Sequence, residues 1–247
     1  EGDQDITATA TDAAGNISSA SVALNVTIDT TATVITLDPL TTNDNTPALS
    51  GTVDEDTALI EVVVDGQSLT ADNNGDNTWS LADGALNTLA DGTYSVVVST
   101  TDVAGNTGTS NPATGLTIDT VDPAAPTDLD LVAGSDTGIT TDDITSATTP
   151  TISGTAEAGS TVNLTSDIDG LVATTTADGA TGVWSVATTA LTDGTHDLTA
   201  TATDTAGNTG DASAALTVTI DTAPPPAPSI PDLAEISDTG DANDDDI

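Results

Sequence analysis

The sequence predicts an all-β protein built as a linear array of tandem, seven-stranded antiparallel β-sandwiches. Short β-branched stretches with period-2 alternation are separated by Gly, Asp, Asn and Pro about every ten residues, which is typical of sandwich strands and their turns. No helical periodicity of useful length occurs. The same phrases also return at long intervals, which indicates repeated domains.

Two complete repeats follow from the spacing of these phrases. The phrase TIDT places its aspartate at Asp29, Asp119 and Asp221, at spacings of 90 and 102 residues. A turn phrase that reads TDAAGN, TDVAGN and TDTAGN recurs at the same two spacings. One complete repeat is therefore predicted at 30–119 and a second at 120–221.

The two ends of the chain hold pieces of further repeats. Residues 1–29 contain the closing phrases of a repeat and are predicted to be the C-terminal fragment of a preceding one. Residues 222–247 echo the opening of the second repeat and are predicted to be the N-terminal fragment of a following one. We therefore expect a window from a longer array.

Each repeat offers one candidate strand after another. In the sixth strand of the second repeat, His196 and Leu198 share one face while Asp197 and Thr199 share the other. Tyr94 takes the place of His196 in the first repeat, where sandwich folds often put a tyrosine that bonds back to the backbone, so a structural role is predicted for both. The strands predicted for the second repeat are 127–133, 150–156, 161–167, 170–177, 182–188, 195–203 and 213–220.

The charge of the chain limits its partners. It has 40 Asp and Glu, one His and no Lys or Arg, for a net charge of −40. Such a charge opposes compaction unless cations screen or bind it, and nucleic acids and anionic membranes both require basic side chains. No apolar run approaches the ~20 residues of a spanning helix, and the opening EGDQDITATA does not resemble a signal peptide. We expect no nucleic-acid partner and no membrane insertion, and the lack of Cys leaves the compartment open.

Strong acidity is also typical of disordered chains. Here the charges lie in clusters at turn-like positions, with alternating β-branched stretches between them, and this pattern favours a folded protein. The hydrophobic fraction of 36% comes almost wholly from Ala, Val, Leu and Ile, which predicts small, thin cores. Trp79 and Trp184, one in each repeat, are predicted to fill these cores rather than to form a platform for carbohydrate.

The second repeat carries a specific resemblance. Its run SDTGITTDDITSATTPTISGTAEAGSTV, continued by GVWSVATTALTDGTHDLTATATDTAGN and LTVTIDT, resembles the bacterial immunoglobulin-like repeat of giant, calcium-dependent secreted surface adhesins of the RTX or biofilm-associated type. The resemblance covers both complete repeats and, through TDAAGN and SDTGDANDDD, both fragments. The first repeat departs from it at its start, where LDPLTTNDNTPALSGT lacks the SDTG element. The resemblance implies an extender module rather than the adhesive tip.

Strand parity predicts where the acidic loops gather. In a sandwich of this type the second-to-third and sixth-to-seventh loops lie at the proximal end, where the chain enters the domain. The first-to-second and fifth-to-sixth loops lie at the distal end, where it leaves. The TDVAGN and TDTAGN turns should therefore meet the VDED and TAEAG loops, respectively, and the incoming linkers. At the distal end of the second repeat, Asp136, Asp142 and Asp143 should meet Asp193 and Asp221.

Carboxylates that gather at one junction without Lys or Arg repel one another unless a hard cation joins them. Calcium accepts about 6–8 oxygens in flexible geometry, whereas magnesium demands a strict octahedron and zinc favours His or Cys. The alternative is plain turn chemistry, in which Asp caps its own backbone and Gly-Asn adopts a left-handed conformation. Three copies at junctions favour calcium. The predicted Ca²⁺ ligands are Asp12, Asn16, Asp29, Asp54, Glu55, Asp56, Asp102, Asn106, Asp119, Asp122, Asp136, Asp142, Asp143, Glu157, Asp193, Asp204, Asn208 and Asp221.

The predicted function is that of a structural extender in a large bacterial cell-surface adhesin, stiffened by calcium between its domains. The partners expected are the adjacent repeats of the same chain, with the adhesive target bound elsewhere in the parent protein. The resemblance implies an extracellular location on the bacterial surface. The alternative is an immunoglobulin-like module that binds a carbohydrate or a protein. An enzyme is not expected, because the distinctive residues recur at every junction and no cluster resembling an active site lies outside the junctions.

Overall fold

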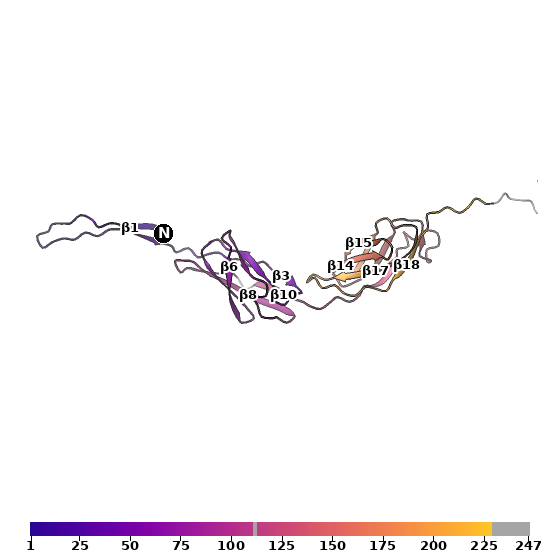
Figure 1. Cartoon of the computed structure of the whole chain (residues 1–247), viewed down its shortest axis with the longest axis horizontal. Helices are drawn as coiled ribbons and strands as arrows, with labels where there is room; N and C mark the ends of the chain where they lie inside the picture. Colours follow the sequence, from indigo (N-terminus) through magenta and orange to yellow (C-terminus); the bar gives the residue numbers. More distant parts are fainter. Residues whose placement is uncertain (111–112, 229–247) are drawn as a thin grey trace, which may run out of the picture.

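The computed structural model describes residues 1–110 and 113–228, and these residues form strands and turns without a helix. A hairpin and two sandwiches follow one another along the long axis of the molecule (Figure 1). The hairpin consists of β1 (Gly2–Ile6) and β2 (Leu24–Ile28). No helix of the described part is long and apolar enough to cross a membrane.

The second sandwich contains two sheets. One has the order β11-β13-β16 and the other the order β12-β18-β17-β14-β15. All neighbours pair antiparallel except β12 and β18, which are parallel. The strands are β11 (Thr127–Leu131), β12 (Ile144–Thr145), β13 (Thr151–Thr155), β14 (Thr161–Ser166), β15 (Gly170–Thr176), β16 (Val183–Ala187), β17 (Gly194–Thr203) and β18 (Leu216–Ile220).

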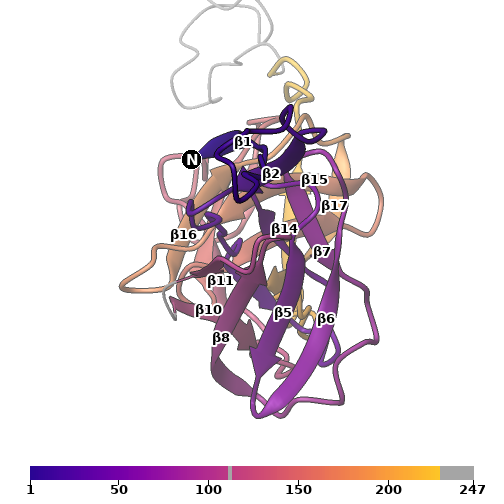
Figure 2. The same cartoon turned by 90° about the vertical axis from the view of Figure 1, so that its left-hand side faces the viewer.

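The first sandwich has the same plan with one continuous path of strands, β3-β10-β8-β5-β6-β7-β4. Its sheets are joined because the end of β6 pairs with β7, and Figure 2 shows β5, β6 and β8 lying side by side. The strands are β3 (Leu40–Thr42), β4 (Leu49–Thr52), β5 (Leu59–Val64), β6 (Gln67–Asn73), β7 (Thr78–Leu81), β8 (Gly92–Thr101), β9 (Thr107–Thr109) and β10 (Ala113–Ile118).

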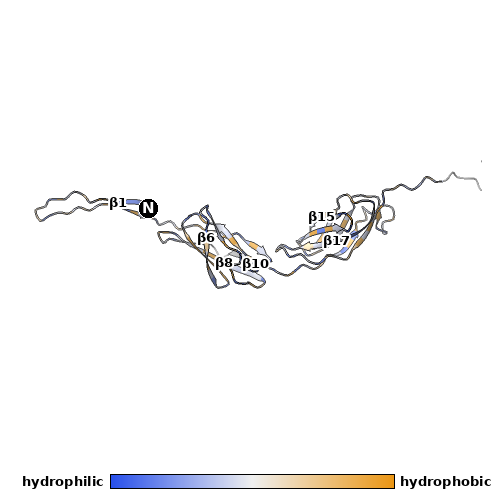
Figure 3. Ribbon diagram, viewed as in Figure 1, coloured by the Kyte–Doolittle hydropathy of each residue, from blue (hydrophilic) through white to orange (hydrophobic). Residues whose placement is uncertain are grey.

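Each sandwich has its own small apolar core. Alternating side chains of the two sheets meet in it, and hydrophobic stretches recur along the strands of both domains (Figure 3). Trp79 is 0% exposed and Trp184 is 2% exposed, as the sequence predicted. The Trp79 indole donates to the carbonyl of Thr36 at 2.7 Å, whereas the Trp184 indole N–H has no hydrogen-bond partner among the described residues.

His196 and Tyr94 occupy the structural position that the sequence predicted. The hydroxyl of Tyr94 donates to the carbonyl of Ala90, four residues upstream, at 2.8 Å. Nε2 of His196 lies 2.7 Å from the carbonyl of Thr192, which is also four residues upstream. Each side chain therefore ties the start of its long strand to the preceding loop.

The hairpin at residues 1–28 has the register of the last main pair of strands in each sandwich. Gly2 pairs with Ile28, as Gly194 pairs with Ile220. Ile28 is exposed in the hairpin, whereas Ile220 is buried. The assignment of residues 1–29 to the C-terminal fragment of a preceding repeat stays a prediction. Most of the predicted fragment at 222–247 lies outside the described residues.

The predicted all-β class of tandem sandwiches is confirmed, and all seven strands predicted for the second repeat are present within a few residues. The structure adds one feature that the prediction lacked. Each sandwich has a short strand near its start, β3 in the first and β12 in the second. This strand pairs parallel with the last strand of the same sandwich, β10 or β18. The predicted boundaries at 29/30, 119/120 and 221/222 remain predictions.

Candidate functional site

The TDTAGN turn is a compact Asx turn closed by Asp204. Oδ1 of Asp204 accepts the backbone N–H groups of Ala206, Gly207 and Asn208 at 2.8–2.9 Å. Oδ2 accepts the side-chain amide of Asn208 at 2.8 Å, and Gly207 has φ of 96°. Glycine meets this left-handed conformation without a Cβ penalty, so the sequence Asp-x-x-Gly-Asn specifies the turn.

The same turn forms at the other two copies. Asn16 and Asn106 donate to Oδ2 of Asp12 and Asp102 at 2.9 and 2.7 Å. These side-chain bonds are the largest cause that holds the pKa of Asp12 and of Asp102 below the ordinary value. At Asp204 burial raises the pKa, but the bonds from Asn208 and the turn amides outweigh it, so the net shift is also downward. All three aspartates are therefore held as charged carboxylates.

The asparagine of the turn also reaches the incoming linker. Nδ2 of Asn208, whose residue is 5% exposed, donates to the backbone carbonyl of Asp119 at 2.8 Å. Nδ2 of Asn106 donates to the carbonyl of Asp29 at 3.1 Å. The structure thus places the sixth-to-seventh loop of each repeat beside its incoming linker, as strand parity predicted.

A further contact at the middle junction was not predicted. The backbone N–H of Asn43 in the first sandwich donates to the carbonyl of Ala206 in the second at 3.0 Å. Beside it, the N–H of Asp119 donates to the carbonyl of Thr42 at 3.0 Å. We refer to these two bonds and the bond from Asn208 to Asp119 as the junction clasp. The sequence did not indicate this contact, because Asn43 is a single asparagine in a polar loop.

The proximal end of the first sandwich brings three predicted acidic residues together. Asp29, Asp54 and Glu55 line one open hollow of about 190 Å³ beside the linker at 31–33. Oδ1 of Asp54 accepts the N–H of Val34 at 2.7 Å, which ties this loop to the linker. Asp56 is exposed and does not line the hollow.

The proximal end of the second sandwich is less acidic. Glu157 lines a hollow together with Ala124 and Ala125 of the incoming linker. Asp119 uses Oδ1 to accept the N–H of Val121 at 3.1 Å, and Asp122 is exposed outside that hollow. The predicted meeting of loop and linker is therefore present, with one carboxylate in the hollow rather than several.

The distal ends are tied by threonine hydroxyls. The Thr222 hydroxyl donates to the carboxylate of Asp193 at 2.8 Å, and Asp91 accepts the Thr120 hydroxyl at 2.9 Å in the first repeat. Asp221 accepts the N–H of Ala223 at 3.0 Å.

Asp136, Asp142 and Asp143 form a separate group in the loop between β11 and β12. Burial first, and then the charges of Asp142, Asp143 and Asp130, raise the pKa of Asp136. The backbone of this loop reaches the outgoing linker, because the N–H of Asp221 donates to the carbonyl of Thr145 at 2.9 Å. The predicted meeting of the three carboxylates with those of Asp193 and Asp221 stays a prediction.

Among residues 1–110 and 113–228, no three carboxylate or imidazole side chains converge in a ready-made metal cage. The turn aspartates are largely satisfied by backbone and amide donors, so plain turn chemistry accounts for their local role. A calcium ion at these junctions would need backbone carbonyls, water and reoriented exposed carboxylates as well.

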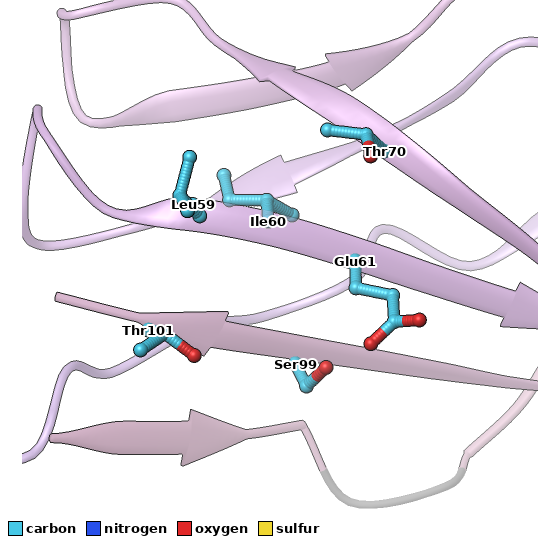
Figure 4. Close-up of a pocket in the computed structure, with 6 residues that line it drawn as sticks. All are labelled: Leu59, Ile60, Glu61, Thr70, Ser99 and Thr101. Atoms are coloured by element: carbon cyan, nitrogen blue, oxygen red, sulfur yellow. The ribbon is translucent and has the colours of Figure 1, made fainter. Parts of the chain in front are cut away.

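A hollow on the first sandwich is lined by Leu59, Ile60, Glu61, Thr70, Ser99 and Thr101 (Figure 4). The Glu61 carboxylate accepts the hydroxyl of Ser68, a neighbour across the strand pair. Neither Ser99 nor Thr101 makes a hydrogen bond to Glu61 that would mark a nucleophile and its base.

The chain belongs to the bacterial Ig-like domain family, whose model matches residues 36–120 and 123–222. Domains of this family are structural or binding modules, so the expectation of a non-enzymatic protein is confirmed. No curated protein sequence matches the chain significantly.

Three solved structures are similar to this chain. A biofilm-associated protein BSP domain shares 21% identity over 77% of this chain and 30% of its own, with a TM-score of 0.31. A 1.5-MDa bacterial ice-binding adhesin shares 24% over 78% and 65%, with a TM-score of 0.36. A tetra-tandem repeat from the extending region of a large adhesion protein shares 25% over 90% and 57%, with a TM-score of 0.33. The chain spans less than two thirds of the length of each of these proteins.

Proposed function

We propose that this chain is an extender segment of a bacterial cell-surface adhesin, in which Ig-like repeats are held end to end outside the cell and stiffened by calcium at their junctions. The observation that carries the proposal is the bond from the turn asparagine to the linker carbonyl, which recurs as Asn208 to Asp119 and Asn106 to Asp29. A contact repeated at successive junctions suits a repeated mechanical part better than a single binding site.

The junction clasp supports the proposed alignment of repeats. Its three hydrogen bonds join Thr42 and Asn43 of the first domain, the linker residue Asp119, and the Ala206–Asn208 turn of the second domain. The net contribution of each hydrogen bond is about 1 kcal/mol. Bonds of this strength favour one orientation of the domains but do not fix it. A second source of stiffness is therefore needed in a long stalk.

Calcium is the proposed second source. The chain has a net charge of −40 and no Lys or Arg, so its carboxylates cannot be paired internally apart from the chain's terminus and His196. The hollow at Asp29, Asp54 and Glu55 gathers three acidic residues from a linker and a loop. Extracellular calcium modules bind at about 10⁻⁴–10⁻³ M, so such sites would fill outside the cell and empty in the cytosol.

A ligand-binding role is the alternative, and no contact of the described residues favours it. Sugar platforms commonly use exposed aromatic rings, whereas Trp79 and Trp184 are buried and Tyr94 is bonded to Ala90.

The proposal is tested by calorimetric titration of calcium into the full chain and into the double variant Asp119→Asn, Asp204→Asn. The two positions belong to different domains but meet at one junction, so the double variant should bind calcium more weakly there and keep the site at Asp29. The matched control is Asp72→Asn with Asp130→Asn, which removes the same charge from exposed residues that take no part in the clasp. Equal calcium binding by all three proteins would refute the role of this junction.

A further inference from the structure

A short strand and the last strand run parallel at the distal end of each sandwich. In the first sandwich Leu40–Thr42 pairs with 116–118, and Figure 1 shows β3 beside β10 at the end that faces the second sandwich. In the second sandwich Ile144–Thr145 pairs with 219–220. Every other strand pair within the described ranges is antiparallel. We call this parallel pair the terminal strand clamp.

Backbone hydrogen bonds hold the clamp and continue into the outgoing linker. In the second repeat the N–H of Thr219 donates to the carbonyl of Asp143 at 2.9 Å. The N–H of Asp221 donates to the carbonyl of Thr145 at the same distance. Its equivalent in the first repeat is the bond from Asp119 in the junction clasp. Thr145 is 1% exposed, so water has little access to compete for these bonds.

The direction of the strands decides how tension loads the clamp. The last strand leads into the outgoing linker, and the short strand runs in the same direction. Tension along a stalk pulls the last strand toward its C-terminal end and the short strand toward its N-terminal end. These opposite pulls act along the strands, so the slanted, evenly spaced bonds of the parallel pair are strained together rather than one after another.

The segment ahead of the short strand is loaded first and is weakly held in the second repeat. It consists of β11 and the loop at 132–143. The pairing of β11 with β13 is interrupted between Thr127 and Asp130, where Asp128 has a left-handed φ of 56°. An interrupted ladder has fewer bonds to resist shear, so we expect β11 to detach before the clamp opens.

Detachment of this segment adds different lengths to the two repeats. In the second repeat it frees 17 residues, 127–143, ahead of β12. In the first repeat the bridge of Ile35 with Val53 begins the equivalent segment, so only five residues, 35–39, precede β3. At about 3.5 Å for each extended residue, the contour lengths are about 60 Å and about 18 Å.

We propose that the terminal strand clamp is the element of each repeat that bears tension, and that residues 127–143 lengthen the second repeat before its clamp is loaded. The proposal rests on the proposed function, because a clamp of this kind serves a stalk that is pulled from its ends. It does not depend on calcium, since its bonds join backbone groups.

Force spectroscopy of the full chain in chelator tests the clamp, with one cysteine added at each end because the chain has none. Thr219→Pro removes the N–H that bonds to Asp143. Thr217→Pro is the matched control, because it lies on the same strand where β12 does not reach. Each variant also loses one threonine hydroxyl contact with β17. The two variants should therefore lose similar stability in urea.

The unfolding force separates the two variants. Thr219→Pro should lower the force of one of the two sandwiches roughly twofold, because a short parallel ladder shares its load among few bonds, whereas Thr217→Pro should leave both forces unchanged. A lengthening of about 60 Å should precede one main unfolding event in the parent chain. Equal forces in the parent and Thr219→Pro, or an equal drop in both variants, would overturn the clamp. Absence of the short lengthening would overturn the role of 127–143.

A further variant keeps the test decisive if Thr219→Pro lacks a native circular dichroism spectrum. Asp221→Pro removes the bond to Thr145 from a position outside the strands and should lower the same unfolding force. An unchanged force in Asp221→Pro would overturn the clamp. Because calcium is absent throughout, this result is independent of whether calcium stiffens the junctions, and the two proposals fail separately.

Discussion

Replacement of Asn208 by alanine removes the side-chain amide that joins the turn of the second repeat to the incoming linker. Two hydrogen bonds of 2.8 Å are lost, one to the carboxylate of Asp204 and one to the carbonyl of Asp119. The bond to the carboxylate is charge-assisted and contributes about 2 kcal/mol, so the second repeat should melt roughly 10 °C lower. The bond to the linker contributes about 1 kcal/mol to domain alignment, which corresponds to about a fivefold change in the fraction of aligned junctions.

Differential scanning calorimetry and hydrogen exchange would separate the two effects. Exchange at the N–H groups of 204–210 should accelerate in Asn208→Ala, and the first repeat should keep its protection. Asn106→Ala removes the equivalent bonds at the preceding junction and is the control, since it should lower the stability of the first repeat alone. If Asn208→Ala changed neither the melting of the second repeat nor the exchange of its turn, the clasp would have no energetic role.

Three other predictions concern the domains themselves. Trp79→Phe should cost about 1 kcal/mol more than Trp184→Phe in urea unfolding, because only Trp79 loses an indole bond to a carbonyl; equal costs would contradict this. Gly51→Ala should prevent stable folding of the first repeat, because its Cβ would lie 2.1 Å from the carbonyl of Thr36; a native circular dichroism spectrum and melting curve would refute the close approach. Hydrogen bonds from the hydroxyl and the backbone N–H of Thr181, and from the backbone N–H of Ala180, lower the pKa of Asp178 in the folded state. Its stabilising contribution is therefore present above the unfolded pKa and lost as the pH falls through the lower folded value, so Asp178→Asn should show a shallower loss of stability below about pH 4. If the stability of the variant and of the parent chain fell equally steeply with decreasing pH, that result would count against the assignment.

The sequence predicted most of the sandwich because its signals are local. Alternation in the strand that contains His196 and Leu198, and the turn residues between strands, specify elements whose neighbours in the chain are also neighbours in the sheet. The single tryptophan in each repeat is its largest apolar side chain, so the sequence predicted that it fills the centre of a core made of small side chains. Strand parity then placed the turn of Asn208 beside Asp119 without any knowledge of contacts.

The features that escaped prediction depend on distant parts of the chain. The parallel pairing of β12 with β18 joins residues that are 75 apart in the sequence. Because β12 has only two residues, it is too short to show the alternation of side chains that marks a strand. The contact of Asn43 with Ala206 depends on how two folded domains meet. The turn asparagines were predicted as oxygen ligands, yet the structure shows their amide N–H groups donating to the linker, a choice that the residue type alone does not settle. Asp130 joins the group at Asp136 from a neighbouring strand, where its sequence position resembles any exposed strand residue.

The most direct test of the calcium-stiffened extender is small-angle X-ray scattering of the full chain in millimolar calcium and in chelator, with sodium added to equal ionic strength. Ionic screening is the same in both solutions, so any difference reports calcium itself. The account predicts that the chelated chain keeps its β-sheet circular dichroism, because each sandwich has its own core, while its maximum dimension shrinks and its scattering becomes that of a flexible chain of domains. Superimposable scattering curves in the two solutions would contradict stiffening by calcium.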